Sequence, residues 1–235
     1  MEIPPNLFLS SLPPADFDAL RPHLRAVELR QSDVLHEIGS PIEKVHFPHN
    51  GIVSLVIDLA SGETIESAMI GRESVVGGSS GLNSQVSLSK AIVQIAGHAS
   101  WTDAHRLRAL ADTSDAAREA LFRHEQLILV QAQQSAACNA THTVEARLAR
   151  WLLRCRDLQQ SDDLILTQEF IAEMLGVRRT SVSVVANTLQ QAGLLRYRRG
   201  HIRILDAQGL HETACECYET VKTQSDRLLG RSSRV

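Results

Sequence analysis

Six arginines in one short segment have the clearest binding chemistry in this sequence. They lie between Gly176 and Asp206 together with one histidine, and Asp206 is the only acidic residue there: Arg178, Arg179, Arg196, Arg198, Arg199, Arg203 and His201. A guanidinium group can donate two parallel hydrogen bonds to a phosphate or to the edge of a guanine. The net charge of the whole chain is −3 and alone argues against a nucleic-acid partner. The local concentration of positive charge is therefore more informative than the total.

A second group of residues has the types that bind metals. Cys138 and His142 are four positions apart on a predicted helix, and Cys215 and Cys217 flank Glu216. Three thiolates and one imidazole can hold zinc tetrahedrally. The two halves are far apart in the sequence, and buried helical cysteines are the commoner explanation. We therefore predict no metal ligand and no cofactor, and keep a metal- or thiol-responsive regulator as the alternative.

The arginines follow a pattern typical of two helices joined by a tight turn. Thr167 can cap a first helix, and Gly176 stands where such a turn requires a positive φ. A second helix is expected from Arg179 to Ala192. The buried positions predicted for the two helices are Ile171, Met174 and Leu175, then Val182, Val185 and Leu189.

Basic and hydroxyl side chains are concentrated at the start of the second helix and in the strands after it. After Gly193, the sequence predicts two short strands that turn through Arg199-Gly200, as in the wing of a winged helix. A recognition helix reads base edges, whereas wing arginines contact phosphates. The predicted DNA-contacting residues are Thr167, Arg178, Arg179, Thr180, Ser181, Ser183, Arg196, Arg198 and Arg199.

The first hundred residues have the pattern of a β-rich domain. Short apolar runs such as 52–57 and 91–95 are separated by glycines, and residues 64–69 alternate between apolar and polar; both features favour strands with one buried face. Residues 115–139 contain no proline or glycine and predict one long helix, whose small and aliphatic stripe suggests a partner helix. Further helices are expected over 144–158 and from about 210 to 229.

These features together resemble the Crp/Fnr family of bacterial transcription regulators. The resemblance rests on residues 167–205, on the long helix before them, and on the β domain with its glycines at 39, 51, 62 and 71. It implies an α+β chain with four parts: an antiparallel β-roll sensor domain (1–112) like those that bind cyclic nucleotides, a long dimerisation helix (113–140), a winged helix-turn-helix domain (141–206), and a C-terminal helical tail (207–235). It also implies a homodimer that binds a palindromic operator on double-stranded DNA and contacts RNA polymerase.

The resemblance assigns individual roles as well. Arg179 matches the guanine-reading arginine of the family, and Thr180 stands where many members have a base-contacting glutamate, so the operator is expected to differ from the usual one.

In the members that bind cyclic AMP, a glutamate and an Arg-Ser or Arg-Thr pair hold the ligand. Those positions fall here near Gly78 and Ser89-Lys90, and a lysine cannot supply the planar fork of an arginine. Cyclic AMP is therefore not the expected ligand. The candidate effector pocket, for an unknown small molecule, comprises Gly71, Arg72, Glu73, Gly77, Gly78, Ser89 and Lys90.

Other functions fit the sequence less well. An iron–sulfur sensor would need N-terminal cysteines, and none precedes Cys138. A cupin-like metalloenzyme would use histidines at spacings that His36, His46 and His49 do not have, so no catalytic residue is predicted. A pure interaction module would leave the arginines unexplained. The sequence has no signal peptide and no membrane span, so we expect a cytoplasmic protein.

Overall fold

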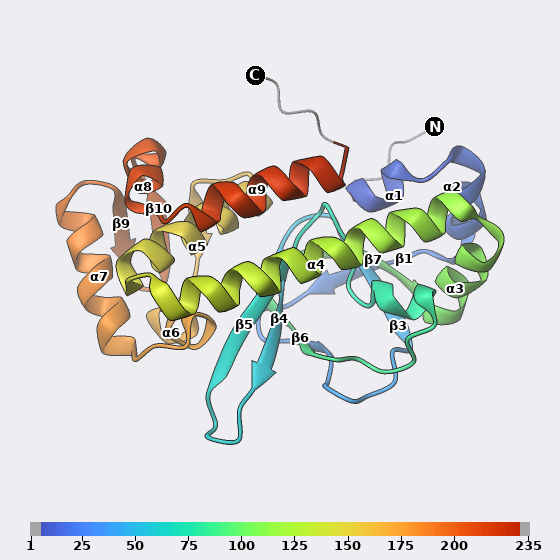
Figure 1. The fold of residues 1–235 in the computed structure, drawn as a ribbon, viewed down its shortest axis with the longest axis horizontal. Coiled ribbons are helices and arrows are strands. Elements are labelled where there is room, and N and C mark those ends of the chain that lie inside the picture. The colour runs from blue at the N-terminus through green and yellow to red at the C-terminus, as the bar shows by residue number, and fades with distance from the viewer. Residues whose placement is uncertain (1–5, 231–235) are drawn as a thin grey trace. The chain divides into compact units, whose positions relative to one another are not determined.

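The computed structural model describes residues 6–230. Its contacts divide the chain into two units. One contains residues up to 55 together with 69–129, and the other contains residues 56–68 together with those from 130 onward. The long helix α4 (Asp115–Thr141) runs through both (Figure 1).

Two sheets form the framework of the first unit, although residues 56–68 of the second sheet belong to the other unit. One sheet has the strand order β1-β7-β3 and the other β2-β6-β4-β5. The strands are β1 (Arg25–Leu29), β2 (Val34–His36), β3 (Lys44–Pro48), β4 (Ile52–Asp58), β5 (Thr64–Ile70), β6 (Lys90–Ile95) and β7 (Gly97–Asp103). Strands β1 and β3 both pair antiparallel with β7, and β2 pairs antiparallel with β6.

Short helices cover this framework and complete its core. They are α1 (Leu7–Ser11), α2 (Pro14–Leu20), the 3-10 turns η1 (Arg21–His23) and η2 (Gly78–Leu82), and α3 (Ala104–Thr113). Phe8 and Phe47 stack with ring centroids 6.0 Å apart. Leu107 and Leu121 are fully buried in the same cluster, so the start of α4 helps to close the core of this unit.

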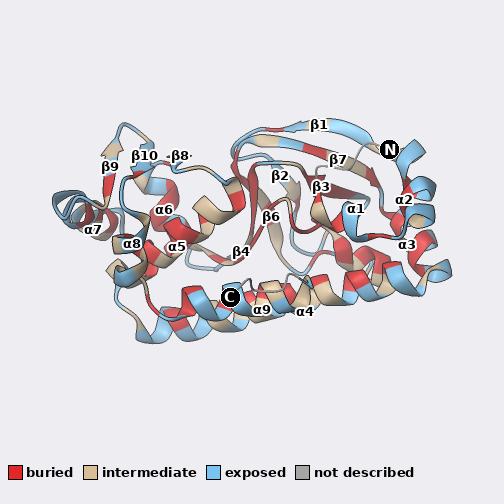
Figure 2. Cartoon of the chain, turned by 90° about the horizontal axis from the view of Figure 1, so that it is seen from above, coloured by how far each residue is buried: buried red, intermediate tan, exposed pale blue. Residues whose placement is uncertain are grey.

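Helix α4 begins where the sequence predicts. The hydroxyl of Ser114 accepts a hydrogen bond from the backbone N–H of Ala117 (3.1 Å), which satisfies one of the free donors at the helix start. Buried and exposed residues are interspersed along the helix (Figure 2). Two large apolar side chains stay exposed, Phe122 at 54% and Leu129 at 56%. They are seven residues apart and therefore lie on the same side of the helix.

The second unit contains the remaining elements. They are α5 (Val144–Gln159), β8 (Asp163–Ile165), α6 (Gln168–Leu175), α7 (Arg179–Gln191), β9 (Leu195–Arg198), β10 (His201–Ile204), α8 (Ala207–Thr213) and α9 (Cys217–Leu228). The three strands pair antiparallel in the order β8-β10-β9. Trp151 and Leu152 of α5 are almost completely buried, so α5 supplies much of the core of this unit.

The expected fold class is confirmed, with an antiparallel β region, a long helix and a C-terminal winged helix-turn-helix. Three details differ from the sequence predictions. Strand β8 and helix α3 were not predicted. The single helix expected from about 210 to 229 is two helices, because Ala214 has extended backbone angles (φ −70°, ψ 153°). Gly209 lies inside α8, where its N–H donates to the carboxylate of the N-cap Asp206 (2.9 Å).

Candidate nucleic-acid interface

Helices α6 and α7 form the predicted helix-turn-helix. The hydroxyl of Thr167 accepts a hydrogen bond from the N–H of Phe170 (3.2 Å) and so caps α6 as expected. Gly176 ends α6 with φ +60°, in the left-handed region. A side chain at this position would also meet Ile65, because an added Cβ would lie 3.0 Å from its Cγ1. Both conformation and space therefore require glycine in this turn.

Helix α7 buries one face and exposes the end that carries the basic residues. Val182, Ala186 and Leu189 are buried. Val185, predicted to be buried, is only partly so, because the buried stripe turns to Ala186 at i+4. Arg178, Arg179 and Thr180 are exposed. The start of α7 is thus free of packing contacts that would hold these side chains away from a ligand.

Two side chains of α6 contact the residues predicted to read DNA. Ser183 Oγ donates to Gln168 Oε1 (2.6 Å) and Arg179 Nε lies 3.6 Å from Glu169 Oε2. The arginine and the glutamate are both largely exposed, so water screens their attraction. Helix α6 therefore restrains the orientation of the predicted reading residues without burying them.

The predicted wing is the hairpin of β9 and β10. Its two-residue turn is Arg199-Gly200, and both residues have positive φ (48° and 79°), as a type I′ turn requires. The wing is fixed to the helices by Tyr197, whose N–H donates to Gln190 Oε1 (2.8 Å) and whose hydroxyl accepts from the N–H of Gln168 (3.2 Å). Arg196 and Arg198 point outward from this sheet as exposed residues.

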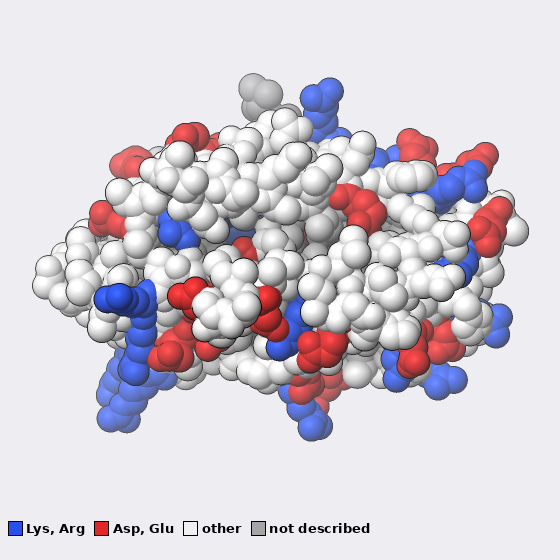
Figure 3. Space-filling model, turned by 60° about the horizontal axis from the view of Figure 1, so that its bottom comes forward, with Lys and Arg blue, Asp and Glu red and all other residues white. Residues whose placement is uncertain are grey.

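The predicted DNA-binding residues all belong to this one unit. Figure 3 shows basic side chains that project from the part of the surface that carries α7. Thr167 is exposed, and Ser181 and Ser183 are partly exposed. The assignment of these residues to DNA contacts stays a prediction.

The structure adds three candidates that the sequence patterns did not single out. Val184 is 68% exposed on α7, beside Ser183, and an exposed methyl group there is the type of side chain that contacts thymine. Gln168 and Glu169 are the other two candidates, because they contact the predicted DNA-reading residues Ser183 and Arg179. Helical spacing places Val184 next to the predicted DNA-reading residues. A valine side chain by itself, however, does not indicate a DNA-binding position in a sequence.

The tip of the β4–β5 hairpin lies beside the same helices. Trp151 Nε1 donates to Glu66 Oε1 (2.9 Å) in a buried hydrogen bond. A hollow of about 640 Å³ is lined by Gly62 and Thr64 of the tip together with Arg178 and Arg179. Because of these contacts, residues 56–68 belong to the second unit.

The candidate effector residues are dispersed over several elements of the first unit. Gly71, Arg72 and Glu73 lie in the turn after β5, Gly77 and Gly78 lie at the start of η2, and Ser89 and Lys90 lie at the start of β6. Side chains of the protein fill the space around the glycine pair. An added Cβ would lie 2.6 Å from His36 Cε1 at Gly77 and 2.7 Å from His124 Cδ2 at Gly78. Packing thus accounts for both glycines, and a ligand at this place stays a prediction.

Buried histidines of this unit are held in the neutral form. Burial lowers the pKa of His124 to about 4. Burial, with smaller contributions from His36 and Lys44, lowers the pKa of His46 to about 4 as well. His36 Nε2 donates to the carbonyl of Lys44 (2.8 Å) and is not directed at an open site. These contacts are those of core histidines, which does not favour the cupin-like metal site.

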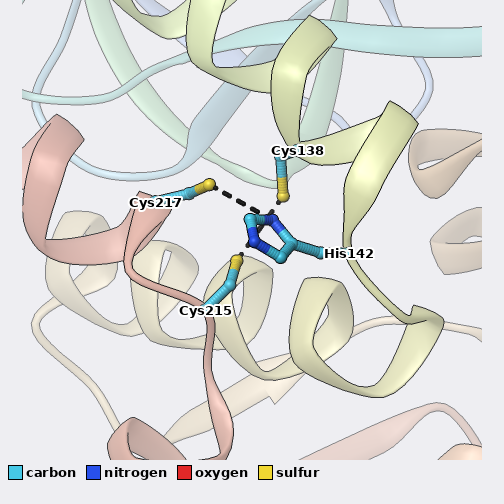
Figure 4. A group of neighbouring side chains, drawn as sticks. All are labelled: Cys138, His142, Cys215 and Cys217. Carbon is cyan, nitrogen blue, oxygen red and sulfur yellow. Dashed lines mark hydrogen bonds between the residues drawn. The ribbon is translucent and has the colours of Figure 1, made fainter.

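The cysteines and the histidine of the alternative hypothesis do come together (Figure 4). The ligand atoms of Cys138, His142, Cys215 and Cys217 all lie within 4.8 Å of one another. Burial raises the pKa of Cys138 and, to about 12, that of Cys215. The fourth cysteine, Cys155, is buried elsewhere in α5.

Comparison with known proteins agrees with this geometry. Residues 146–213 match the family model of the Crp-like helix-turn-helix domain. FixK2 from Bradyrhizobium japonicum is 20% identical with a TM-score of 0.70, over 82% of this chain and 98% of that one. The c-di-GMP responsive regulator CLP from Xanthomonas campestris is 18% identical with a TM-score of 0.65, over 81% and 98%. A CRP/FNR family regulator from Thermus thermophilus is 20% identical with a TM-score of 0.65, over 81% and 98%.

These matches identify the fold of the chain and one of its domains. The chain has the fold of these solved regulators, and residues 146–213 match a Crp-like helix-turn-helix domain. No curated protein is significantly similar to the chain in sequence. No helix in the described part of the chain has the length and apolar character that crossing a membrane requires.

Proposed function

We propose that this protein regulates transcription as a homodimer that binds a two-fold symmetric DNA site. The observation that carries the proposal is the start of α7, where the side chains of Arg178, Arg179 and Thr180 are exposed, in the same unit as the arginine-bearing wing. Arg179 reads a guanine in each half-site, and the hydroxyl groups of Thr180 and Ser183 bond to neighbouring base edges or phosphates. Arg196, Arg198 and Arg199 of the wing bind phosphates and set the register.

The exposed face of α4 supports pairing with a second copy of the chain. Phe122 and Leu129 are the large apolar residues of that face, and Ala136 continues it one heptad further along the helix. Two such faces packed together remove these side chains from water. A dimer of this kind places two recognition helices about one DNA turn apart, roughly 34–36 Å.

The first unit acts as the sensing part of the regulator in this proposal. It holds the predicted effector residues, and any effector must bind the DNA-competent arrangement more tightly than the other to shift the equilibrium. DNA binding of this kind is expected in the cytoplasm, with RNA polymerase as the partner through which transcription changes.

The experiment that tests the proposal is selection of binding sites from random DNA with the full chain. We expect an enriched sequence with two-fold symmetry. Arg179→Ala is expected to lose preference at one base pair per half-site, by about 1–3 kcal/mol. Arg25→Ala is the matched control, because Arg25 is an exposed arginine of the first unit that lies over Trp101. Unchanged specificity in Arg179→Ala would remove the recognition assignment.

A further inference from the structure

Four side chains from two distant parts of the sequence converge at the end of α4. Cys138 lies in the last turns of α4 and His142 follows that helix, while Cys215 and Cys217 lie where α9 begins. Figure 4 shows the three sulfur atoms directed toward the imidazole ring. Cys138 Sγ is 3.5 Å from Cys215 Sγ, and Cys217 Sγ is 3.5 Å from His142 Nδ1.

These separations are those of the edges of a zinc tetrahedron. With Zn–S bonds of about 2.3 Å and a Zn–N bond of about 2.0–2.1 Å, tetrahedral angles give S–S edges of about 3.8 Å and N–S edges of about 3.6 Å. The two measured distances of 3.5 Å fall within a few tenths of an ångström of these values. The other separations among the four ligand atoms are no more than 4.8 Å, so the donors must move closer together in part to bind one ion.

Polar side chains outside the cluster contact two of the four donors, His142 and Cys217. His142 Nε2 lies 3.3 Å from Glu216 Oε2, so an N–H at Nε2 faces the carboxylate and the lone pair of Nδ1 is directed toward the sulfur atoms. Carboxylate–histidine pairs of this kind orient the histidine ligands of zinc. Gln134 Nε2 donates to Cys217 Sγ (3.0 Å), a bond that would stabilise a thiolate.

Positive charge at the cluster gives a second, independent reason for a bound thiolate complex. Arg147 and Arg150 both interact electrostatically with Cys138. Arg147 is only 7% exposed, and among the described residues its Nε and that of Arg150 have no hydrogen-bond partner. Three thiolates and Zn²⁺ carry a net charge of −1, which compensates part of the charge of these two guanidinium groups, whereas three neutral thiols compensate none.

We propose that Cys138, His142, Cys215 and Cys217 bind one zinc ion with four protein ligands. Each thiol releases its proton to solvent when its sulfur bonds to the metal, and His142 binds as neutral imidazole through Nδ1. A zinc ion with four protein ligands has no open position for substrate or water, so the site is structural rather than catalytic. It joins the end of α4 to the start of α9. The inference is independent of the DNA-binding proposal.

Metal analysis of the full chain, purified under reducing conditions, tests the proposal directly. We expect about one zinc per chain, and loss of that zinc in His142→Ala and in Cys217→Ser. Cys155→Ser is the matched thiol control and should keep its zinc, because Cys155 lies outside the cluster. His211→Ala is the matched histidine control, since His211 pairs with Glu219 instead.

Glu216 contacts His142 but is not itself a proposed ligand, so a substitution at Glu216 leaves all four ligands in place. We expect Glu216→Gln to weaken zinc affinity roughly 10–100-fold, measured by competition with a chromophoric chelator. Glu219→Gln should leave the affinity unchanged, because that carboxylate pairs with His211, 2.7 Å away.

Substitution with cobalt keeps the proposal testable if a ligand variant fails to fold. The wild-type chain with Co²⁺ should show a thiolate-to-cobalt charge-transfer band and the intense visible bands of tetrahedral cobalt. Any of four results would overturn the proposal: cobalt spectra without thiolate coordination, no zinc retained after reconstitution, iron in place of zinc, or full zinc retention in both ligand variants. A Cys138–Cys215 disulfide in the reduced preparation would do the same, because that bond removes two ligands.

Discussion

The guanidinium of Arg179 forms an ion pair with Glu169 across the turn of the helix-turn-helix, at an Nε to Oε2 distance of 3.6 Å. Arg179 is the residue that we propose to read a guanine. In the free protein its charge is thus partly compensated by a carboxylate of α6, and DNA has to displace that carboxylate to receive the full guanidinium group.

Glu169→Gln should therefore tighten DNA binding. An exposed ion pair of this kind contributes about 0.2–1 kcal/mol, so we expect an affinity increase of up to about fivefold per half-site at low salt. Fluorescence anisotropy with a selected operator measures it. Glu212→Gln is the matched control, because Glu212 is an exposed glutamate of α8 that bonds to Gln208 instead. Weaker binding by Glu169→Gln would instead mean that the glutamate orients Arg179 for recognition.

Loss of a wing arginine should weaken binding to all sequences alike. Each lost phosphate contact lowers the slope of log K against log salt concentration by about 0.9. Arg198→Ala tests one position. Arg199→Asn tests the next, because Arg199 has a positive φ of 48° and asparagine tolerates that conformation. Binding isotherms across a salt series measure the slope, and Arg30→Ala, in an exposed residue just after β1, should leave it unchanged. A change confined to one operator sequence would contradict the phosphate assignment.

A charge on the exposed face of α4 should dissociate the dimer. Leu129→Glu places a carboxylate on a residue that is 56% exposed in the single chain, so the substitution costs the monomer little but would be buried against a partner. Sedimentation velocity should show a shift from dimer to monomer with weaker operator binding. Leu88→Glu is the matched control, because Leu88 is 79% exposed and lies in the loop before β6. A monomeric wild-type chain at micromolar concentration would contradict the proposed pairing.

Acid should destabilise the first unit through its buried histidines. The pKa of His124 is about 4 in the folded chain, against 6.5 for the free side chain. The unfolded state therefore takes up a proton first as the pH falls, and stability is present above about pH 6.5 and is lost between 6.5 and 4. The difference corresponds to about 3 kcal/mol for this residue. Burial dominates even though Glu125 Oε1 lies 3.7 Å from His124 Nε2.

Urea unfolding at several pH values measures this effect. His124→Gln should flatten the pH dependence of the unfolding free energy, whereas His105→Gln, in an exposed residue, should leave it unchanged. An equally steep dependence in His124→Gln would assign the acid lability to another group.

Sequence patterns were sufficient where the determinants are local. The wing was predicted because Arg199-Gly200 is a two-residue turn between alternating strands, and the structure has that hairpin. The first helix of the motif was predicted from its cap, Thr167, and from Gly176 at its end. Strand β8 was missed because its three residues are held by pairing with β10, a contact that no local pattern reveals.

The features that the sequence did not predict depend on contacts between residues that are far apart in the chain. The metal-type residues were recognised in the sequence, but Cys138 and Cys215 are 77 positions apart. Their proximity depends on how α8 and α9 pack against α5, which hydrophobic spacing does not specify. The ion pair of Arg179 with Glu169 likewise depends on the angle between two helices, although both residues were visible in the sequence.

The connection between α4 and α5 has a mechanical consequence. Helix α4 ends at Thr141 and α5 begins at Val144, so the joint consists of His142 and Thr143. Thr143 is held as the N-cap of α5, where its hydroxyl accepts from the N–H of Ala146 (3.3 Å), and His142 is held in the cysteine cluster. A joint this short, with both side chains engaged, has few free torsions. A rotation of the end of α4 is therefore transmitted to α5, and the contacts of His142 and Thr143 together determine how rigid this connection is.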